Sequence, residues 1–213
     1  MSIDKIKKIF PFWIRSFVWR SIPKIHKVNT YILNNPKLIA KLRPIDQIYE
    51  IKRITWDDEQ RLKDFYSDPK RYARKIPKRL KSPEWVGLSV IDTINGNIAY
   101  IAWVITKSIK YFEEFGVKLK NGQFLLKDGF CHPEYRHQGL HTRMEQERIN
   151  YCIKNGAHEI FIQIHDSNKG GINSVLNNGY KLYQQNCVIQ WPVFHVYRSL
   201  KGFLRNPFIK VVK

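Results

Sequence analysis

The sequence has few cysteines, no long apolar run and no repeated motif. Its three cysteines lack CxxC spacing and form an odd number, so we expect no disulfide framework, and a reducing cytoplasm suits the chain best. The apolar stretch at 9–22 is broken by Arg15 and Arg20, which makes it too short and too charged to span a bilayer. No signal cleavage site follows it. The lack of a repeat argues against a repeat architecture.

Acidic residues are also scarce. The 213 residues include 37 Lys and Arg but 18 Asp and Glu, which gives a formal net charge of +19. An excess of this size first suggests a nucleic-acid partner. However, residues 1–45 hold +9 of this charge and residues 190–213 hold +5. The middle of the chain is therefore an ordinary soluble domain, and nucleic acid is not the partner we expect.

The composition fits one domain with an extension. Hydrophobic residues make up 43% of the chain and aromatic residues 14%, which excludes a disordered protein and allows a real core. Apolar residues at helical spacing, punctuated by prolines, predict a basic, aromatic-rich helical extension at 1–45. The domain proper is then 46–213, with a basic C-terminal tail.

Strand and helix patterns alternate along this domain. Asn95-Gly96 between two β-rich runs predicts a hairpin, and Asn155-Gly156 predicts the end of a helix. A strand, a helix of about four turns and a second strand in succession predict a parallel βαβ unit. The expected strands are 47–54, 85–94, 98–105, 123–131, 159–164, 180–191 and 193–198, and the expected helices are 55–66, 68–83, 139–155 and 169–178.

The turn between the strand of this unit and its helix carries the clearest chemical signal. It reads His-Pro-Glu-Tyr-Arg-His-Gln-Gly-Leu-His over 132–141. A turn that enters a helix presents unpaired backbone N–H groups at the positive end of the helix dipole, which suits an anion such as a pyrophosphate. Gly139 lets a ligand approach the backbone closely, and Arg136 can add a charged contact.

These residues resemble the GNAT acyltransferase superfamily. Its pyrophosphate loop is written Arg/Gln-x-x-Gly-x-Gly/Ala, and here Arg136 and Gly139 stand at the first two defined positions, with Asn168 and Gly179-Tyr180 downstream at family spacing. The resemblance is strong over 123–186 and absent over 1–45. It implies an α/β (α+β) fold, with a mixed, mostly antiparallel sheet, a central parallel βαβ unit and flanking helices.

The resemblance also implies acetyl-CoA, or another acyl-CoA, as co-substrate, bound between the strands at 123–131 and 159–164. Backbone groups near Phe130 and Cys131 would pair with the pantetheine, and the amides of 138–142 would cradle the pyrophosphate. The cofactor-binding residues implied in this way are Phe130, Cys131, Arg136, His137, Gln138, Gly139, Leu140, His141, Thr142 and Asn168.

Three positions depart from the family pattern. His141 stands where the loop usually ends in Gly or Ala, and His137 replaces the usual Gly, so CoA binding requires both imidazoles to point outward. Val175 occupies the place of a tyrosine that many members use as general acid for the leaving thiolate. Tyr180 and Tyr183 lie nearby in sequence, and Tyr183 is retained as a candidate acid.

Two residues are candidates for the base that takes the amine proton. Asp128 lies mid-strand, where family members often place a carboxylate, although a neighbouring Lys or Arg can equally satisfy it structurally. His165 is the competitor because it stands at the carboxyl end of a strand and has a suitable intrinsic pKa, although a lone histidine is often structural.

The histidines around the loop do not predict a metal site. His137 and His141 are four residues apart, but the helix begins between them, so they need not share a face, and no second ligand pair is evident. Cys131 is not expected to act as a nucleophile because no base is fixed beside it.

The implied activity is N-acetyl transfer to the amine of a small molecule. We favour an amino sugar, nucleotide- or lipid-linked, from surface-polysaccharide assembly, and the cationic body suits an anionic acceptor such as a sugar phosphate. One alternative is transfer of a longer acyl chain at the membrane. Another is a non-catalytic GNAT-fold module that binds membrane or nucleic acid.

The two ends of the chain mix basic and aromatic residues. Segments 1–27 and 190–213 have the composition of interfacial membrane segments, with rings for the headgroup boundary and cations for anionic lipid. The alternatives are packing of the aromatic residues on the domain and binding of single-stranded RNA. The expected location is the cytoplasm, peripheral to the inner face of the membrane.

Overall fold

One mixed sheet organises the molecule. The computed structural model describes residues 24–66, 68–107, 118–190 and 195–199, and within these ranges eight strands pair in the order β2-β3-β4-β5-β6-β1-β7-β8. The strands are β1 (Lys24–Asn34), β2 (Tyr49–Arg53), β3 (Trp85–Asp92), β4 (Ile98–Ile105), β5 (Gln123–Cys131), β6 (Glu159–His165), β7 (Lys181–Gln190) and β8 (His195–Ser199). Every neighbouring pair is antiparallel except β5 and β6, which are parallel.

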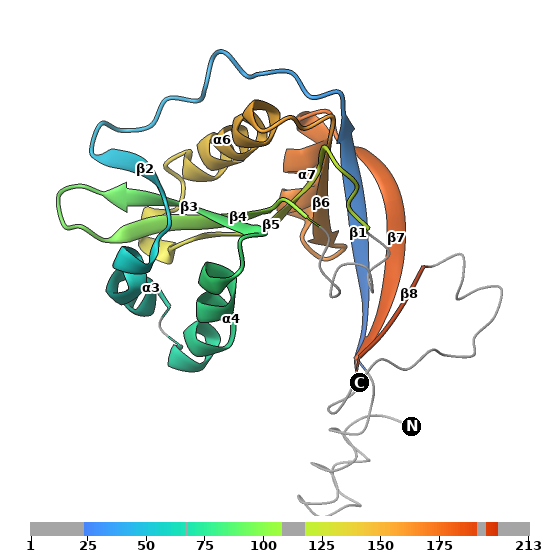
Figure 1. Ribbon diagram of the computed structural model, residues 1–213, viewed down its shortest axis with the longest axis horizontal. Coiled ribbons are helices and arrows are strands. Elements are labelled where there is room, and N and C mark those ends of the chain that lie inside the picture. Colours follow the sequence, from blue (N-terminus) through green and yellow to red (C-terminus); the bar gives the residue numbers. More distant parts are fainter. Residues whose placement is uncertain (1–23, 67, 108–117, 191–194, 200–213) are drawn as a thin grey trace, which may run out of the picture.

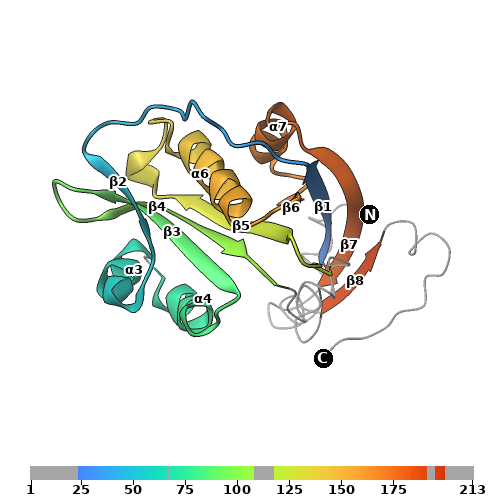
Figure 2. The same ribbon diagram turned by 45° about the horizontal axis from the view of Figure 1, so that its top comes forward.

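Helices cover both faces of this sheet. The α6 and α7 helices lie on one face, and α3 and α4 lie on the other (Figures 1 and 2). The sheet twists, so that β1 and β7 run across the direction of β3 and β4 in the view of Figure 1. The helical elements are η1 (Trp56–Asp58), α3 (Glu59–Phe65), α4 (Pro69–Lys81), η2 (Pro133–Tyr135), α6 (Leu140–Lys154) and α7 (Lys169–Asn177).

Local signals account for where these elements begin and end. Gly96, with a φ of 74°, makes the turn between β3 and β4, and the chain leaves α6 through Asn155 and Gly156. Thr55 and Asp58 form a capping box at the start of the η1–α3 segment. The predicted mixed sheet, the hairpin and the βαβ unit are confirmed.

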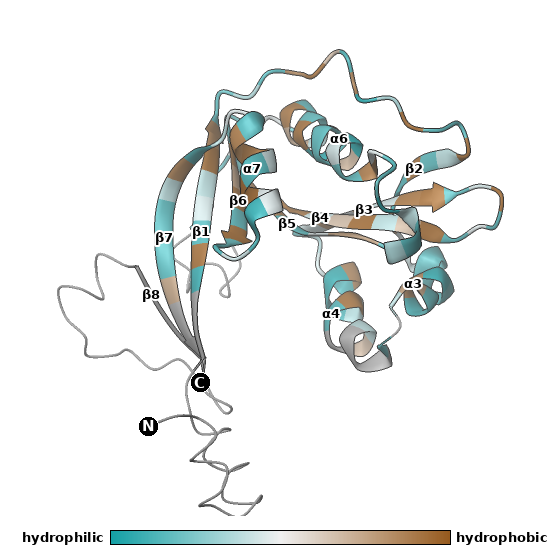
Figure 3. Cartoon of the chain, turned by 180° about the vertical axis from the view of Figure 1, so that it is seen from behind, coloured by the Kyte–Doolittle hydropathy of each residue, from teal (hydrophilic) through white to brown (hydrophobic). Residues whose placement is uncertain are grey.

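The core is continuous through the sheet because β4 is covered from both sides. All eight of its residues are buried. On one side Val104 and Leu126 pack with Ile149 of α6. On the other side Trp103 packs with Leu62 of α3 and Ile76 of α4. Apolar residues are accordingly concentrated on the central strands (Figure 3).

The prediction of a helical extension over 1–45 is wrong at 24–34, because these residues form β1. This strand lies inside the sheet, antiparallel to β6 on one edge and to β7 on the other. Val28, Thr30 and Ile32 are buried, and their β-branched side chains suit a strand. Residues 35–45 form no helix either. Residues 1–23 of the predicted extension lie outside the described residues, as do 191–194 and 200–213 of the predicted tail.

Two general properties complete the description of the fold. None of the described helices is both long and apolar enough to cross a membrane. The three cysteines are all free, and Cys152 and Cys187 are buried.

Candidate functional site

The parallel pair at the centre of the sheet opens halfway along. The β5–β6 ladder begins at Gln123 and Glu159 and ends at Leu126 and Ile162. Beyond this point β5 continues along β4, and β6 continues along β1, so the two strands diverge. A cavity of about 230 Å³ lies at the divergence and is lined by 126–129 of β5, 162–165 of β6 and residues of α6 and α7.

A bulge in β5 stands at the edge of this cavity. The pairing of β4 with β5 shifts between Ile101 and Trp103, and Asp128 has a φ of 44°, in the left-handed region. Aspartate tolerates this conformation better than most residues. Gly129 follows, and a side chain there would collide with the Tyr100 hydroxyl, 2.6 Å from the Cβ position. The bulge therefore bends β5 away from β6 and keeps the opened edge free of a side chain at 129.

The loop before α6 brings backbone N–H groups to one end of the cavity region. His137 and Gly139 have φ values of 66° and 78°, and α6 begins at Leu140. A Cβ at Gly139 would lie 3.1 Å from Nε of Arg43, so Arg43 covers the start of the helix. The main chain of Arg43 is fixed there, because its N–H donates to Gln146 over 2.7 Å and its carbonyl accepts from Arg143 over 3.0 Å. The loop and Arg43 together form a cationic cradle.

Solved structures share this fold. The chain matches a tandem GNAT protein from the clavulanic acid biosynthesis pathway with a TM-score of 0.59 and 13% identity, over 76% of this chain and 52% of that one. It matches a GCN5-related N-acetyltransferase from Sphaerobacter thermophilus with a TM-score of 0.54 and 12% identity, over 87% and 56% of the two chains. The chain has the GNAT fold.

A third GNAT neighbour is the glucosamine N-acetyltransferase region of a fungal multi-domain GH3 β-N-acetylglucosaminidase. It matches with a TM-score of 0.52 and 13% identity, over 81% of this chain and 22% of that one. The chain spans about half the length of the first two neighbours. No protein-family model and no curated protein sequence matches it.

The loop residues expected from the GNAT motif divide into three groups. Arg136, His137 and Gln138 are exposed, and Gln138 accepts a hydrogen bond from the Tyr49 hydroxyl. Leu140 is buried in the core, so only its backbone faces the loop, and Thr142 is half-buried. Gly139 stands at the start of α6 beside Arg43. His141, in the first turn of α6, lines the cavity.

His141 is exposed, and its imidazole also stands beside the cavity. It lines the cavity, and its Nδ1 lies 2.7 Å from the hydroxyl of Tyr100. Burial lowers the pKa of His141, and burial raises the pKa of Tyr100 to about 12. The imidazole lines the cavity as an exposed side chain. His137 is exposed as well.

The structure places Asp128 in an ion pair. Its carboxylate is bound by Arg79 and lies 3.6 Å from Nζ of Lys75, both on α4. Burial alone would raise the pKa of Asp128, but Arg79, Lys127 and Lys75 outweigh it and hold the pKa at about 2. A carboxylate with this pKa is a weak proton acceptor. This geometry favours the structural alternative for Asp128, which is to fasten α4 to β5.

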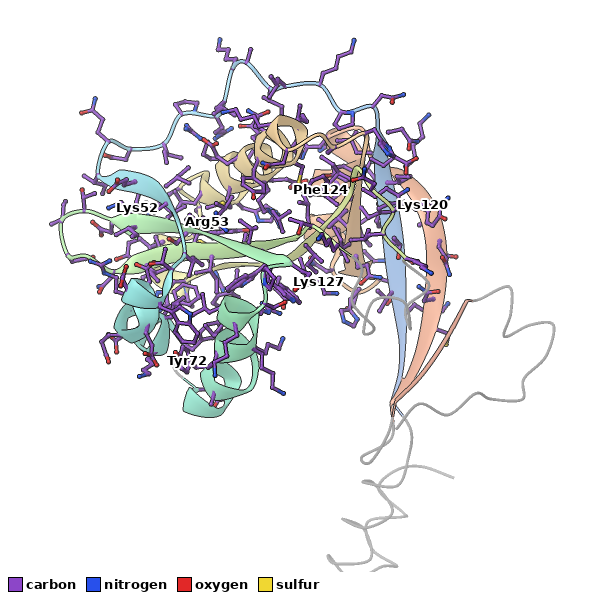
Figure 4. All side chains as sticks on the ribbon, in the orientation of Figure 1. Lys52, Arg53, Tyr72, Lys120, Phe124 and Lys127 are labelled. Carbon is purple, nitrogen blue, oxygen red and sulfur yellow. The ribbon has the colours of Figure 1, made fainter. Side chains whose placement is uncertain are left out.

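Lys127 is a neighbour of this ion pair that the sequence did not single out. It lies on the α4 side of the sheet (Figure 4), and its Nζ donates to Gln163 over 3.0 Å. Burial lowers the pKa of Lys127 to about 8, and the nearby charges of Arg79 and Lys75 add to this effect. The carboxylate of Asp128 raises the pKa, but by less. The α4 side of the bulge is thus rich in positive charge.

The other predicted residues are unevenly placed around the cavity. His165 is exposed and lines the cavity, and Asn168 lines it too while its side chain caps α7 by accepting from Gly171 N–H over 3.0 Å. Tyr183 does not line it, because it lies on β7 with its ring 5.4 Å from that of Phe161. Val175 lines the cavity where many GNAT members have tyrosine.

The two β5 residues expected to pair with pantetheine lie past the bulge. Phe130 pairs with Ile101 of β4, and its ring packs 5.6 Å from that of Phe65. Cys131 pairs with Tyr100, and burial raises the pKa of its thiol. Neither residue is paired with β6, whose ladder with β5 has already ended.

Sequence reasoning missed two buried charges, Glu145 and Arg148. Both lie on α6, and both line the cavity. A signal was present, because they follow His141 by four and seven residues and so share its face of the helix, beside the buried Met144 and Ile149. Charged residues at core-facing positions are rare unless they are paired or functional. For Arg43 the sequence offered no signal, since it is distant from the loop along the chain.

Proposed function

We propose that this chain is an acyl-CoA-dependent N-acyltransferase that transfers acetyl from acetyl-CoA to the amine of a small molecule. The observation that carries the proposal is the opening of β5 from β6 at Leu126 and Ile162, with a cavity at the opening and a cationic loop at the start of α6. The GNAT fold of the chain supports the same reaction class.

The residues present fit acetyl-CoA. The loop at Gly139 suits a pyrophosphate because Gly139 has no Cβ and lies beside Arg43. The N–H groups of 138–142 would bind the phosphate oxygens. The edge of β5 at 127–131, where the ladder with β6 has ended, would hold the pantetheine arm. Acetyl-CoA supplies an activated thioester, so the protein has to position two substrates and remove one proton.

We assign the base to His165. It stands at the cavity, at the carboxyl end of β6, and it is accessible to an acceptor amine. Imidazole accepts a proton near pH 7, whereas Asp128 is held ionised by Arg79 and Lys75. Asp128 would then act indirectly, because its ion pair fixes the bulge beside the cavity.

An amino sugar carrying an anionic group is our preferred acceptor. Helix α4 has seven basic residues and no acidic one in its sequence, and it flanks the bulge through Lys75 and Arg79. A phosphate would be attracted to this side of the sheet. The GNAT region of the fungal neighbour is a glucosamine N-acetyltransferase, which supports the same class of amine. Faster turnover of glucosamine phosphate than of glucosamine would support this acceptor. Equal turnover would contradict the proposal that the acceptor carries an anionic group.

Titration with acetyl-CoA in a calorimeter tests the cofactor. We expect saturable binding by the wild-type chain and at least about 100-fold weaker binding by Gly139→Glu, which fills the cradle with a negative side chain. Lys154→Gln is the matched control, because it changes the net charge by the same −1 at the far end of α6. Because Gly139 has a positive φ, thermal unfolding without ligand must show that the variant is folded, and Arg43→Gln should weaken binding about 10-fold without that strain.

A non-catalytic CoA-binding module is the second candidate, and Val175 is the observation that favours it. This side chain cannot donate a proton to a leaving thiolate. Saturable acetyl-CoA binding without acetylation of any amine in a broad panel would support the module. Membrane contact by 1–27 and 190–213, and a cytoplasmic location, remain predictions.

A further inference from the structure

The wall of the cavity formed by α6 contains two buried charges. Glu145 is 1% exposed and Arg148 is 2% exposed. An ion removed from water in this way costs several kcal/mol unless other groups satisfy it, so buried charges are normally paired and hydrogen-bonded. Their neighbours along this face, Met144, Ile149 and Cys152, are buried apolar side chains that cannot do so.

Neither charge is fully satisfied. Glu145 accepts one hydrogen bond at Oε2, from the Ser174 hydroxyl over 3.1 Å, and Nε2 of His141 lies 3.9 Å from the same oxygen. Among the residues that the structure describes, Oε1 of Glu145 and Nε of Arg148 are buried without a hydrogen-bond partner. One acceptor and one donor in the same wall are therefore buried without a partner.

These groups lie next to the opened edge of β5. Both residues line the cavity together with Gly129, and Nη2 of Arg148 is 3.6 Å from the Cβ position at Gly129. A ligand that follows the edge of β5 past the bulge would thus pass the guanidinium and the carboxylate.

The chemistry of the pair selects among ligand groups. The two charges sum to zero, so a carboxylate or phosphate ligand would gain from Arg148 and lose to Glu145. A secondary amide suits both, because its carbonyl oxygen accepts and its N–H donates. The pantetheine arm of CoA contains two such amides.

We infer that Arg148 and Glu145 bind an amide of the pantetheine arm, with Arg148 donating to the amide carbonyl and Glu145 accepting from the amide N–H. The inference rests on the proposed function, because it concerns how this chain holds acyl-CoA. Charged side chains of α6 would then bind the pantetheine arm together with the backbone of β5.

Calorimetric titration with two ligands tests the inference. Acetyl-CoA contains the arm, whereas adenosine 3′,5′-bisphosphate lacks it. For Arg148→Met we expect acetyl-CoA to bind about 10- to 100-fold more weakly, the range for losing a charged hydrogen bond, and the nucleotide to bind as it does to the wild type. Glu145→Gln keeps an acceptor, so its loss should be smaller, about threefold. Lys154→Met, on the exposed end of α6, is the control for both.

A structural role gives different results. If Arg148 served the fold, Arg148→Met would lower the unfolding temperature without ligand and weaken both ligands together, which would overturn the inference. Unchanged acetyl-CoA affinity in folded Arg148→Met would also overturn it while leaving the proposed function intact. If Arg148 instead bound a carboxylate on the acyl group, succinyl-CoA would bind more tightly than acetyl-CoA. Arg148→Met would then remove this preference and leave acetyl-CoA affinity unchanged, which would overturn the inference. No acetyl-CoA binding by the wild type would overturn both proposals.

Discussion

Two carboxylate–guanidinium sets flank the bulge in β5, and they differ in whether their hydrogen bonds are made. On the α4 side, Asp128 binds Arg79, whose guanidinium lies 4.3 Å from the ring centroid of Trp85 and 5.1 Å from that of Trp103. On the α6 side, Glu145 and Arg148 keep buried atoms without partners. The first set is complete within the protein, so it contributes to stability. The second set keeps one acceptor and one donor without partners beside a cavity, which is why we propose that it binds a ligand.

Among the variants that test this difference, replacement of Arg79 should have the largest effect on stability. Arg79→Met removes the hydrogen-bonded partner of Asp128, leaving Lys75, and removes the two cation–π contacts. We expect a loss of about 2–3 kcal/mol in the free energy of unfolding, at the low end for a buried pair because about a third of Asp128 is exposed. Urea unfolding without ligand measures it. Arg148→Met should lose little in the same experiment, and an equal loss in both variants would remove the contrast between the two sides.

His165 tests whether the cavity side performs the chemistry. His165→Gln keeps polarity and approximate size but accepts no proton at neutral pH, so we expect a 10- to 100-fold lower kcat with acetyl-CoA affinity nearly unchanged. The ascending limb of the wild-type pH profile of kcat should also be absent from the profile of His165→Gln. A full rate in His165→Gln would transfer the assignment to another base.

Asp128 gives a smaller, pH-dependent effect. Its pKa is lowered from 3.8 to about 2 in the folded chain, so the carboxylate contributes stability that is present above about pH 4 and is lost as the pH falls from there to about 2. Because about a third of the side chain is exposed, we expect Asp128→Asn to cost about 1 kcal/mol at pH 7. Urea unfolding at pH 7 and at pH 3 should show the difference shrinking. A constant difference would contradict the ion-pair explanation.

Tyr183 should give the smallest effect. Its ring packs near that of Phe161, and it does not line the cavity, so Tyr183→Phe should leave both kcat and acetyl-CoA affinity within about twofold. A loss above 10-fold in kcat alone would restore Tyr183 as the general acid and extend the chemistry beyond the cavity described here.

The sequence predicted the elements on which the site stands. The βαβ unit, the hairpin at Asn95-Gly96 and the loop at Gly139 all depend on short-range signals such as turn residues, caps and periodicity, and all are confirmed. It failed at β1, where prolines suggested short helices although Val28, Thr30 and Ile32 carried a strand signal. A strand at this place is decided by the two strands that pair with it, β6 and β7, which lie far along the chain.

The sequence alone thus determined the fold class and the position of the loop before α6. The tertiary structure decided which charges are satisfied. Asp128 has Arg79 because α4 packs beside β5, Gly139 has Arg43 because the chain after β1 crosses the start of α6, and Arg148 has an open cavity. Element type follows from neighbours in sequence, but the state of a buried charge depends on groups that only folding brings within a few ångströms.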